Sequence, residues 1–257
     1  MKTLGFQTWS GIIAALALTL LVSASTAPAA TTVTSTSIAD AMLLPNITTN
    51  TNRGLQPAMY VGDAGTGGGD TRSVLQFSLA NIPAGQVILS ATLKLKIEGF
   101  GNNTPAQITT DGYRLLSSWV EGDGLSGLDS GTSGVTWDRR DKAGTLPNWI
   151  VGGASGSGTD RAATSSFTLT GADQSGLVVS KDVTSDVQAW YSGAASNFGW
   201  LLQAQSFASG QYTQYATKEE PTVGDRPVLT VTFEPIPEAS SALLLGGLFL
   251  LRRRRKS

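Results

Sequence analysis

Alternating apolar and polar positions predict β-strands in the middle and near the end of the chain. Residues 92–98 (TLKLKIE) and 228–233 (VLTVTF) alternate with a period of two, which is typical of a strand with one buried face. A slip of one residue would turn the whole apolar set of such a strand to solvent, so we expect that set to be buried. Its members are Leu93, Leu95, Ile97, Leu229, Val231 and Phe233.

Glycine-, serine- and asparagine-rich turns separate most of the further strand candidates. These candidates are residues 58–62, 73–79, 107–116, 165–170, 177–180, 199–205 and 211–217. One short helix is predicted over residues 184–191, where Val187 and Tyr191 lie four apart. Asp182 or Thr184 is placed to cap its N-terminus. About ten short strands and one short helix predict an all-β fold, a single antiparallel β-sandwich of jelly-roll type.

Residues 1–30 follow the order of a cleavable secretory signal. Lys2 gives a weakly positive start, residues 12–22 form an apolar run, and small residues follow at Ala29–Ala30. That order is typical of a peptide that signal peptidase removes on export. We therefore expect the sandwich to occupy residues 31–235 and to work outside the cytoplasm.

The tail, residues 236–257, combines a Pro-Glu turn, a short apolar run and five consecutive basic residues, Arg252 to Lys256. Basic clusters stay at the cytoplasmic, anionic face of a membrane, so everything before the apolar run is predicted to lie outside. Counted from Ser240, the run holds 12 residues, or about 18 Å of helix, against a hydrocarbon core roughly 30 Å thick. The segment is short for a permanent span, and a C-terminal anchor is the alternative.

The order of these parts resembles the PEP-CTERM sorting signal, with Pro237-Glu238-Ala239 where that family has Pro-Glu-Pro. The resemblance implies a sorting signal marked by Pro237 and Glu238, which holds the protein transiently in the inner membrane. It also implies that an exosortase-type membrane protease reads the tail and cuts it off. The mature protein is then expected in the cell envelope or outside the cell.

The body contains five blocks that resemble the DNRLRE domain and follow one another in that family's order. The blocks are residues 72–85 (RSVLQFSLANIPAG), 88–95 (ILSATLKL), 182–193 (DVTSDVQAWYSG), 216–219 (ATKE) and 226–233 (RPVLTVTF). They span nearly the whole body, although Ser78 stands where the family usually has Asp. The resemblance implies a β-sandwich of bacterial extracellular proteins, often appended to polysaccharide-active enzymes, with some members that bind acidic polysaccharides.

Composition excludes several classes of function. The signal and the tail hold six of the 18 basic residues and one of the 19 acidic residues, so the body carries 12 positive and 18 negative charges, a net charge of −6. An acidic body without a basic stripe repels phosphate backbones, which argues against nucleic acid as a partner. The chain has no cysteine and no histidine. Ser-His-Asp hydrolysis, His-ligated zinc and His general-base chemistry are therefore excluded.

A glycine-rich loop with a carboxylate at each end, Asp63 to Asp70, is the candidate metal site. Calcium needs six to eight oxygens, which two carboxylates and backbone carbonyls can help to supply. A plain hairpin turn is the alternative, because such turns are commonly rich in Gly and Asp. Two other acidic groups, Asp138–Asp141 and Glu219–Glu220, are predicted to be an exposed turn with local ion pairs and a solvated strand end.

Aromatic residues offer a route to sugar binding, because flat rings cover the C–H faces of sugars. Trp190 and Trp200 are predicted to lie in the core, and Trp119 and Trp137 to pack against the end of the sandwich. Trp149, in a Pro/Asn/Gly-rich loop, is the candidate for a sugar-stacking face. An anionic glycan would further need a local basic patch, for which Arg139, Arg140 and Lys142 are the candidates, or a calcium bridge.

Together these patterns predict an exported, surface-sorted, non-catalytic protein that binds polysaccharide at the cell surface or in an extracellular matrix. A structural envelope or matrix protein without a small ligand is the alternative. A polysaccharide lyase or hydrolase, using Tyr, Lys, Arg or carboxylates, is a third hypothesis. The predicted sandwich fills the body and leaves no room for a separate catalytic domain, which argues against the enzyme.

Overall fold

The structure is a computed structural model that describes residues 29–45, 51–64, 69–101, 108–125, 131–170 and 176–236. Both predicted export segments, with Pro237 and Glu238, lie outside these residues except for their ends next to the body. The strands are β1 (Thr31–Leu43), β2 (Ala58–Gly62), β3 (Arg72–Phe77), β4 (Gln86–Phe100), β5 (Thr109–Arg114), β6 (Phe167–Thr170), β7 (Val178–Asp182), β8 (Trp200–Ala204), β9 (Tyr212–Ala216) and β10 (Val228–Pro235). The helices are α1 (Thr184–Tyr191) and a 3₁₀ turn, η1 (Val223–Asp225). Among the described residues, no helix is long and apolar enough to cross a membrane.

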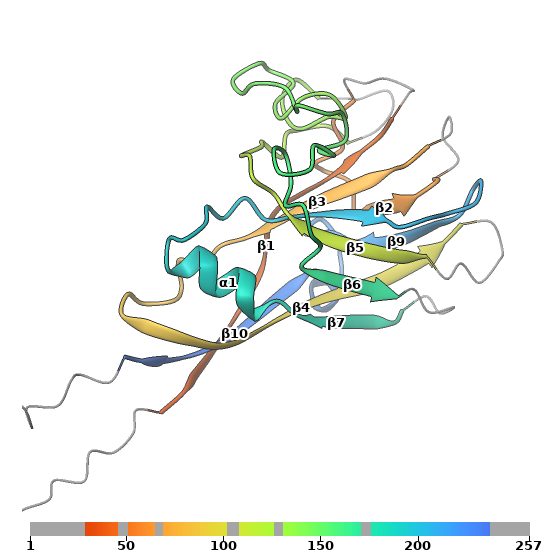
Figure 1. Cartoon of the computed structure of the whole chain (residues 1–257). Coiled ribbons are helices and arrows are strands. Elements are labelled where there is room, and N and C mark those ends of the chain that lie inside the picture. The colour runs from red at the N-terminus through yellow and green to blue at the C-terminus, as the bar shows by residue number, and fades with distance from the viewer. Residues whose placement is uncertain are drawn as a thin grey trace, which may run out of the picture.

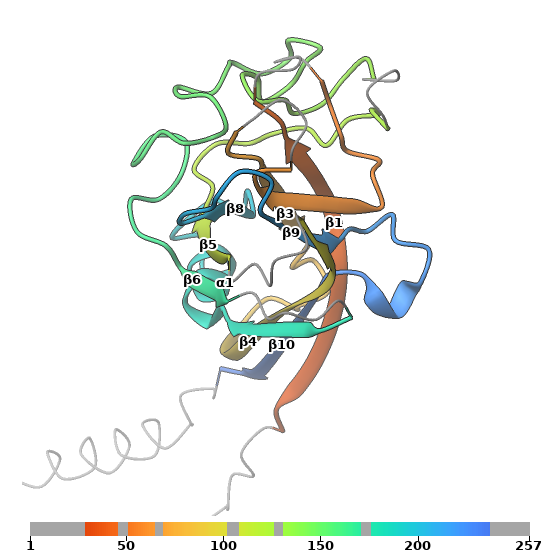
Figure 2. The ribbon, with the colours of Figure 1, turned by 90° about the vertical axis from the view of Figure 1, so that its right-hand side faces the viewer.

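The strands form one continuous antiparallel path that folds over on itself (Figures 1 and 2). Its order is β2-β9-β4-β10-β1-β3-β8-β5-β6, and β7 pairs with β4 beside this path. The two long strands, β1 and β4, determine how the path folds over, because each changes its pairing partner along its length. β1 pairs first with β10 and then with β3, with a register shift between Ser37 and Ala39. β4 pairs with β10 and β7 and then with β9, with a shift between Ile97 and Gly99. Such bulges bend a strand, so the path closes into two packed layers.

The main core lies between these layers and contains the six side chains that alternation singled out. All six are buried, with Phe233 the most exposed at 4%. Trp200 lies fully buried in this core, where its ring makes edge contacts with Phe77 and Phe167 and a tilted contact with Trp190. Its Nε1–H donates to a buried carboxylate oxygen of Asp186 at 2.7 Å. The predicted all-β antiparallel sandwich with one short helix is confirmed, as are the core positions of Trp190 and Trp200.

Helix α1 has the predicted bounds and packs on β4. Its Val187 and Trp190 are buried in the main core, and Gln188 donates from Nε2 to the carbonyl of Ile88 at 2.9 Å. Val183 is the N-cap residue and provides no side-chain cap, but Asp182 just before it accepts the backbone N–H of Thr184 at Oδ1, at 2.8 Å. The hydroxyl of Thr184 instead lies between that carboxylate and β4.

The long connection between β5 and β6 forms a second layer of packing. We call its described residues, 115–125 and 131–166, the loop layer; Figure 1 shows it in green above the strands. It buries the outer face of β3 and β8, where Val74 and Leu201 are 0% exposed. The residues of this second core are Ala41, Leu43, Val74, Leu115, Trp119, Val135, Trp149, Ala154 and Leu201. β3 and β8 are therefore buried on both faces, by the main core on one side and by the loop layer on the other.

Candidate functional site

A cavity of about 200 Å³ opens beside β2 and β9, on the face turned away from the main core. Its walls are Met42, Leu44, Arg53, Gln56, Tyr60, Ala64 and Tyr212. Strand alternation explains its aromatic wall. Met59 and Val61 of β2 point into the main core, so Tyr60 between them points outward. We call this cavity the tyrosine pocket.

Two tyrosine rings meet at the wall of the tyrosine pocket. Tyr60 and Tyr212 have ring centroids 5.0 Å apart and ring planes at 87°, an edge-to-face contact. Both side chains are half-buried. Burial, with a smaller contribution from Tyr212, raises the pKa of Tyr60 above its usual value of 10.0. The Tyr60 hydroxyl is therefore protonated at neutral pH and able to donate a hydrogen bond.

Arg53 adds an unused donor to the tyrosine pocket. Its side chain is half-buried, and its buried Nε has no hydrogen-bond partner among the described residues. Burial lowers the pKa of the guanidinium below its ordinary value, but arginine in proteins remains charged at neutral pH. An unpaired buried donor costs about 1–3 kcal/mol, and in the described residues this donor belongs to a side chain that lines the pocket.

The segment that carries Arg53 and Gln56 is held firmly at both ends. Asn52 donates from Nδ2 to the carbonyls of Glu121 at 2.6 Å and Val135 at 2.8 Å. Its Oδ1 accepts the backbone N–H of Gly124 at 2.8 Å. At the other end, the hydroxyl of Thr217 donates to the carbonyl of Gln56 at 2.6 Å. The donors of the tyrosine pocket are therefore set on a fixed backbone.

Gly54 lies in the same segment and lets it pass close to the loop layer. A Cβ atom at this position would lie only 2.3 Å from the carbonyl oxygen of Glu121. The backbone N–H of Gly54 also donates to Oδ1 of Asn52 at 3.2 Å. A side chain at position 54 would therefore move the segment that carries Arg53.

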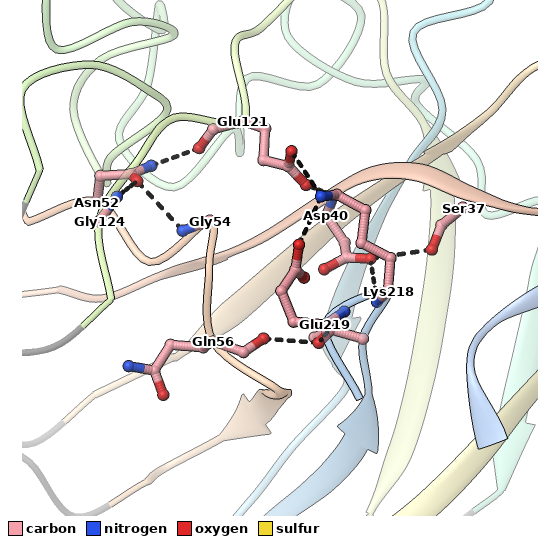
Figure 3. Close-up of polar contacts among 10 residues, drawn as sticks. Ser37, Asp40, Asn52, Gly54, Gln56, Glu121, Gly124, Lys218 and Glu219 are labelled. Carbon is pink, nitrogen blue, oxygen red and sulfur yellow. Dashed lines mark hydrogen bonds and ion pairs between the residues drawn. The ribbon is translucent and has the colours of Figure 1, made fainter. Parts of the chain in front are cut away.

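A second group of candidate residues lies beside this segment (Figure 3). Asp40 comes from the second half of β1, Glu121 from the loop layer, and Lys218 and Glu219 from the chain just after β9. Among the described residues, Asp40, Glu121 and Glu219 are the one group of three acids whose carboxylate oxygens lie within 4.8 Å of one another. We call Asp40, Glu121, Glu219 and Lys218 the acidic cluster.

Hydrogen bonds and ion pairs hold the acidic cluster together. Asp40 accepts at Oδ2 from the Ser37 hydroxyl at 3.0 Å and from the Lys218 backbone N–H at 2.9 Å. The backbone N–H of Asp40 donates to Glu121 Oε1 at 2.8 Å. The Lys218 ammonium pairs with Glu121 Oε2 at 3.0 Å and with Glu219 Oε1 at 2.5 Å.

Burial dominates the electrostatics of the acidic cluster. It raises the pKa of Asp40 from 3.8 to about 8, while the Lys218 N–H opposes the rise and the charges of Glu219 and Glu121 add to it. Burial likewise raises the pKa of Glu121, against the hydrogen bond from Asp40 and the ion pair with Lys218. Paired carboxylates of this kind serve as acid and base in glycosidases. Asp40, however, is only 1% exposed, so a sugar cannot reach it.

The structure corrects the prediction made for Glu219. Its side chain is 18% exposed and ion-paired, so the predicted solvated strand end is wrong for this residue. Local sequence carries no signal for the cluster, because Asp40 and Lys218 are 178 residues apart and Asp40 and Glu121 are 81 apart. These residues come together only in the fold, in which β1 and β9 belong to one strand path and the loop layer packs against it.

The structure places Trp149 in the second core. It is 5% exposed, and its Nε1–H donates to the carbonyl of Thr136 at 3.2 Å. The prediction of an open sugar-stacking face on Trp149 is therefore wrong, because the loop layer folds down on the sheet and buries the ring. Trp119 is buried in the same core, and Trp137 packs against it with the Arg72 guanidinium 5.1 Å from its ring centroid.

The candidate basic patch is made of half-buried side chains that bind backbone carbonyls of the loop layer. Arg140 donates from Nε to Pro147 at 2.8 Å, and Lys142 donates from Nζ to Gly131 at 2.7 Å. Arg139 makes a longer contact, 3.5 Å from Nη1 to the Lys142 carbonyl. These donors hold the loop layer together, and glycan binding by them stays a prediction.

Asp141, beside these bases, is 2% exposed, so the predicted exposed turn is wrong at this residue. Its carboxylate accepts the backbone N–H groups of Gly134 at 2.8 Å and Ala143 at 3.1 Å. It also accepts from the backbone and the hydroxyl of Thr145. Asp141 thus holds one turn of the loop layer in place.

The two acids of the predicted calcium loop have different protein partners. Asp70 forms an ion pair and hydrogen bonds with Arg72, and Asp63 accepts the backbone N–H of Gly210 at 3.0 Å. Neither belongs to the acidic cluster. Residues 65–68 between them lie outside the described part of the chain, and calcium in this loop stays a prediction.

Comparisons with known proteins add no family to this picture. No model of a known protein family matches the chain, and no curated protein matches it either. The resemblances to the DNRLRE domain and to the PEP-CTERM signal stay predictions. The tyrosine pocket and the acidic cluster are therefore the features from which a function is inferred.

Proposed function

We propose that this protein is an exported, non-catalytic β-sandwich that binds a polysaccharide through the tyrosine pocket. The observation that carries the proposal is the combination of the Tyr60–Tyr212 ring pair with the unpartnered Nε of Arg53 in one cavity of the described residues. Sugars need flat apolar faces for their C–H surfaces and polar donors for their hydroxyl or carboxylate oxygens. The tyrosine pocket supplies both.

The size of the tyrosine pocket sets what part of a glycan it takes. Its volume of about 200 Å³ is below the roughly 300–1,000 Å³ of sites that enclose a drug-sized ligand. It therefore suits one sugar unit, at a chain end or protruding from a chain, while neighbouring units run over the surface. Among the described residues of its wall, Arg53 is the one basic residue, so it is the group that would bind the carboxylate of a uronic acid.

The proposal of a non-catalytic role rests on the acids that are within reach. The described wall of the tyrosine pocket has no carboxylate, and the buried Asp40 of the acidic cluster is closed to a sugar. With no histidine in the chain, an acid–base pair for glycoside cleavage would have to come from other carboxylates. A structural envelope or matrix protein without a glycan ligand remains the competing hypothesis.

The proposed route to the cell surface rests on the sequence alone. The leader at residues 1–30 and the tail at 236–257 support export, sorting by an exosortase-type protease and a final place in the cell envelope or outside the cell. Mass spectrometry of the protein from its native host tests this. A surface-exposed form that still ends at Ser257 would contradict removal of the tail.

Binding to a panel of neutral and uronic-acid polysaccharides tests the proposed function. We expect the full chain to bind at least one of them, and Tyr212→Ala and Arg53→Gln each to weaken that binding about tenfold or more, or roughly 1.4 kcal/mol. The matched control is Lys94→Gln, which removes one charge from an exposed residue of β4 outside the pocket. Binding that both pocket variants retain would contradict the site, and release of reducing or unsaturated sugar ends would contradict the non-catalytic role.

Salt dependence distinguishes the two classes of glycan. The net charge of −6 on residues 31–235 repels an anionic chain at long range, and added salt screens both this repulsion and the attraction to Arg53. A neutral glycan should therefore bind with little dependence on salt, and an anionic one with a strong dependence. If no glycan binds, the structural hypothesis takes the place of this proposal.

A further inference from the structure

We propose that Asp40, Glu121 and Glu219 bind a single divalent cation through their oxygens, and that calcium is the ion that suits them best. The site lies where the second half of β1, the start of the loop layer and the chain just after β9 meet (Figure 3). The proposal does not depend on the tyrosine pocket or on the binding of a glycan.

The spacing of the three carboxylates fits one shared ion. One oxygen from each lies within 4.8 Å of the others. Ligands that surround a calcium ion at about 2.3–2.6 Å are separated from one another by at most about twice that distance. Magnesium requires a nearly ideal octahedron at about 2.0–2.1 Å, whereas calcium accepts irregular sets of oxygens, so the trio favours calcium.

An unpaired oxygen on a buried side chain points to a ligand. Asp40 is 1% exposed, and its Oδ2 accepts two hydrogen bonds, but its Oδ1 has no partner among the described residues. Glu219 likewise has a buried Oε2 without a partner in this part of the chain. A buried acceptor left unpaired destabilises the folded protein, and a charged one does so more strongly. A cation bound to both oxygens would remove this destabilisation.

The charges of the acidic cluster leave room for a divalent ion beside Lys218. Three ionised carboxylates carry three negative charges, and the Lys218 ammonium offsets one of them. The ammonium is paired with Glu121 Oε2 and Glu219 Oε1, which leaves Glu219 Oε2 and Asp40 Oδ1 without a donor from the described residues. A divalent ion bound at these oxygens brings the cluster to neutrality without removing Lys218.

The acidic cluster is open enough for an ion to enter. The side chains of Glu121, Glu219 and Lys218 are 19%, 18% and 24% exposed, so one side of the cluster faces solvent. Calcium takes six to eight oxygens, and water on this open side can complete the set that three carboxylates begin. Asp40 forms the closed inner side.

Calcium titration of the full chain tests this proposal. After treatment with a chelator, we expect one calcium ion to bind per chain and to raise the melting temperature, because a ligand that binds only the folded state stabilises it. Asp40→Asn should abolish both effects, and Glu219→Gln should weaken calcium binding at least tenfold. Glu220→Gln, at the neighbouring position outside the cluster, is the matched control and should behave like the unaltered protein.

Two further variants test the role of Lys218 and the place of the ion. Lys218→Met removes the competing positive charge and should tighten calcium binding, whereas a purely structural ion-pair network would lose stability and gain no calcium affinity. Asp70→Asn alters the loop at residues 63–70 and should leave the calcium response unchanged. If Asp40→Asn fails to fold, Glu219→Gln, at the solvent-facing side, carries the test.

Three results would overturn the proposal: no calcium binding by the full chain, an unchanged calcium response in both Asp40→Asn and Glu219→Gln, or a response lost in Asp70→Asn alone. Calorimetry with calcium chloride and no glycan reads out the metal site directly. Loss of glycan binding in the pocket variants, with calcium binding intact, would leave this proposal standing. The failure of one proposal can therefore be told from the failure of the other.

Discussion

Two aspartates, Asp160 in the loop layer and Asp40 in the acidic cluster, are equally buried and differ in how their oxygens are used. Each is 1% exposed. Asp160 accepts the backbone N–H of Ile150 at Oδ1 and those of Val151 and Gly156 at Oδ2, all at 2.9–3.0 Å. Asp40 uses only Oδ2, and other carboxylates surround it. A saturated buried carboxylate shapes the protein's own chain, whereas an unsaturated one has capacity left for a ligand.

The same difference separates the two regions as a whole. In the loop layer, the residues that the sequence marked as candidates for ligand binding make contacts within the protein instead. Trp149 fills the second core, and Arg140 and Lys142 bind backbone carbonyls. Where the ends of β1 and β9 meet, Asp40 Oδ1 and Arg53 Nε have no partners in the described part of the chain. Binding capacity is therefore expected beside β1 and β9 and not in the loop layer.

Among the substitutions that test the difference between the loop layer and the region beside β1 and β9, Trp149→Ala should have the largest effect on stability. Replacing a buried tryptophan by alanine typically costs about 3–5 kcal/mol, because it removes apolar contacts and leaves a cavity. Trp149→Ala should therefore lower the free energy of unfolding by about that amount, measured by urea denaturation. Glycan binding should be unchanged at temperatures where the variant is folded. A stable variant with weakened glycan binding would return Trp149 to the role of a sugar-stacking residue.

Removing the charge of Asp160 should have the next largest effect. In Asp160→Asn one oxygen becomes an NH₂ group that faces backbone N–H donors, so at least one buried donor loses its acceptor. We expect a loss of about 2–4 kcal/mol in the free energy of unfolding. Asp138→Ala, a half-buried residue of the same loop layer, is the control and should cost less than about 1 kcal/mol. Equal losses in the two variants would show that Asp160 does not anchor the loop layer.

Acid should lower the stability of the loop layer, because it protonates the carboxylate of Asp141. Burial pushes the pKa of Asp141 upward, but the hydrogen bonds that its carboxylate accepts outweigh burial and hold the pKa below its usual 3.8. The unfolded chain therefore binds the proton more readily near pH 4. The stability that Asp141 contributes is complete above about pH 4 and is lost as the pH falls through the native pKa.

The test is urea unfolding of the protein and of Asp141→Asn between about pH 2 and pH 6. Asp141→Asn should be less stable than the unaltered protein at pH 6, and the gap should close toward pH 2. A gap that stays constant over this range would mean that the ionised carboxylate of Asp141 is not what stabilises the turn.

The sequence predicted the parts of the fold in which one face of a strand is buried. Leu93, Leu95 and Ile97 alternate with polar residues because their strand has one face in the core and one toward solvent. The pattern missed β1, since its end at residues 40–43 is buried without alternation and its start is largely exposed. Helix α1 was predicted from Val187 and Tyr191, which lie four apart and both pack in or against the main core.

The candidate sites were harder to predict, for a physical reason. The sequence shows which residues carry chemistry, but it does not show whether the chain itself uses their hydrogen-bonding groups. A Pro/Asn/Gly-rich stretch around Trp149 is typical of an exposed loop, yet this loop folds back as a layer and buries the ring. The acidic cluster depends on residues far apart in the chain, and no local pattern marks Asp40 or Glu219 as neighbours.

The smallest expected loss of stability comes from the same substitution at the other aspartate, measured in the presence of a chelator. Asp40→Asn replaces a buried carboxyl group that faces Glu121 and Glu219, while Lys218 stays paired with both glutamates. Burial raises the pKa of Asp40 to about 8, so the neutral form is favoured in the folded protein at neutral pH. Asn cannot ionise, so it takes the place of the favoured neutral form without binding a proton on folding. Asp40→Asn should therefore be at least as stable as the unaltered protein at pH 7.

The sign of the pH dependence sharpens this last test. The native pKa of Asp40 lies above the unfolded value of 3.8, so the folded state binds the extra proton, and stability falls as the pH rises from about 4 to about 8. Asp40→Asn should lack this fall, so in chelator its stability relative to the unaltered protein should rise from about pH 4 and level off above about pH 8. Urea unfolding from pH 5 to pH 9, with Asp160→Asn in parallel, measures the difference. A large loss in Asp40→Asn at every pH, like that expected for Asp160→Asn, would mean that both aspartates only hold the chain in place.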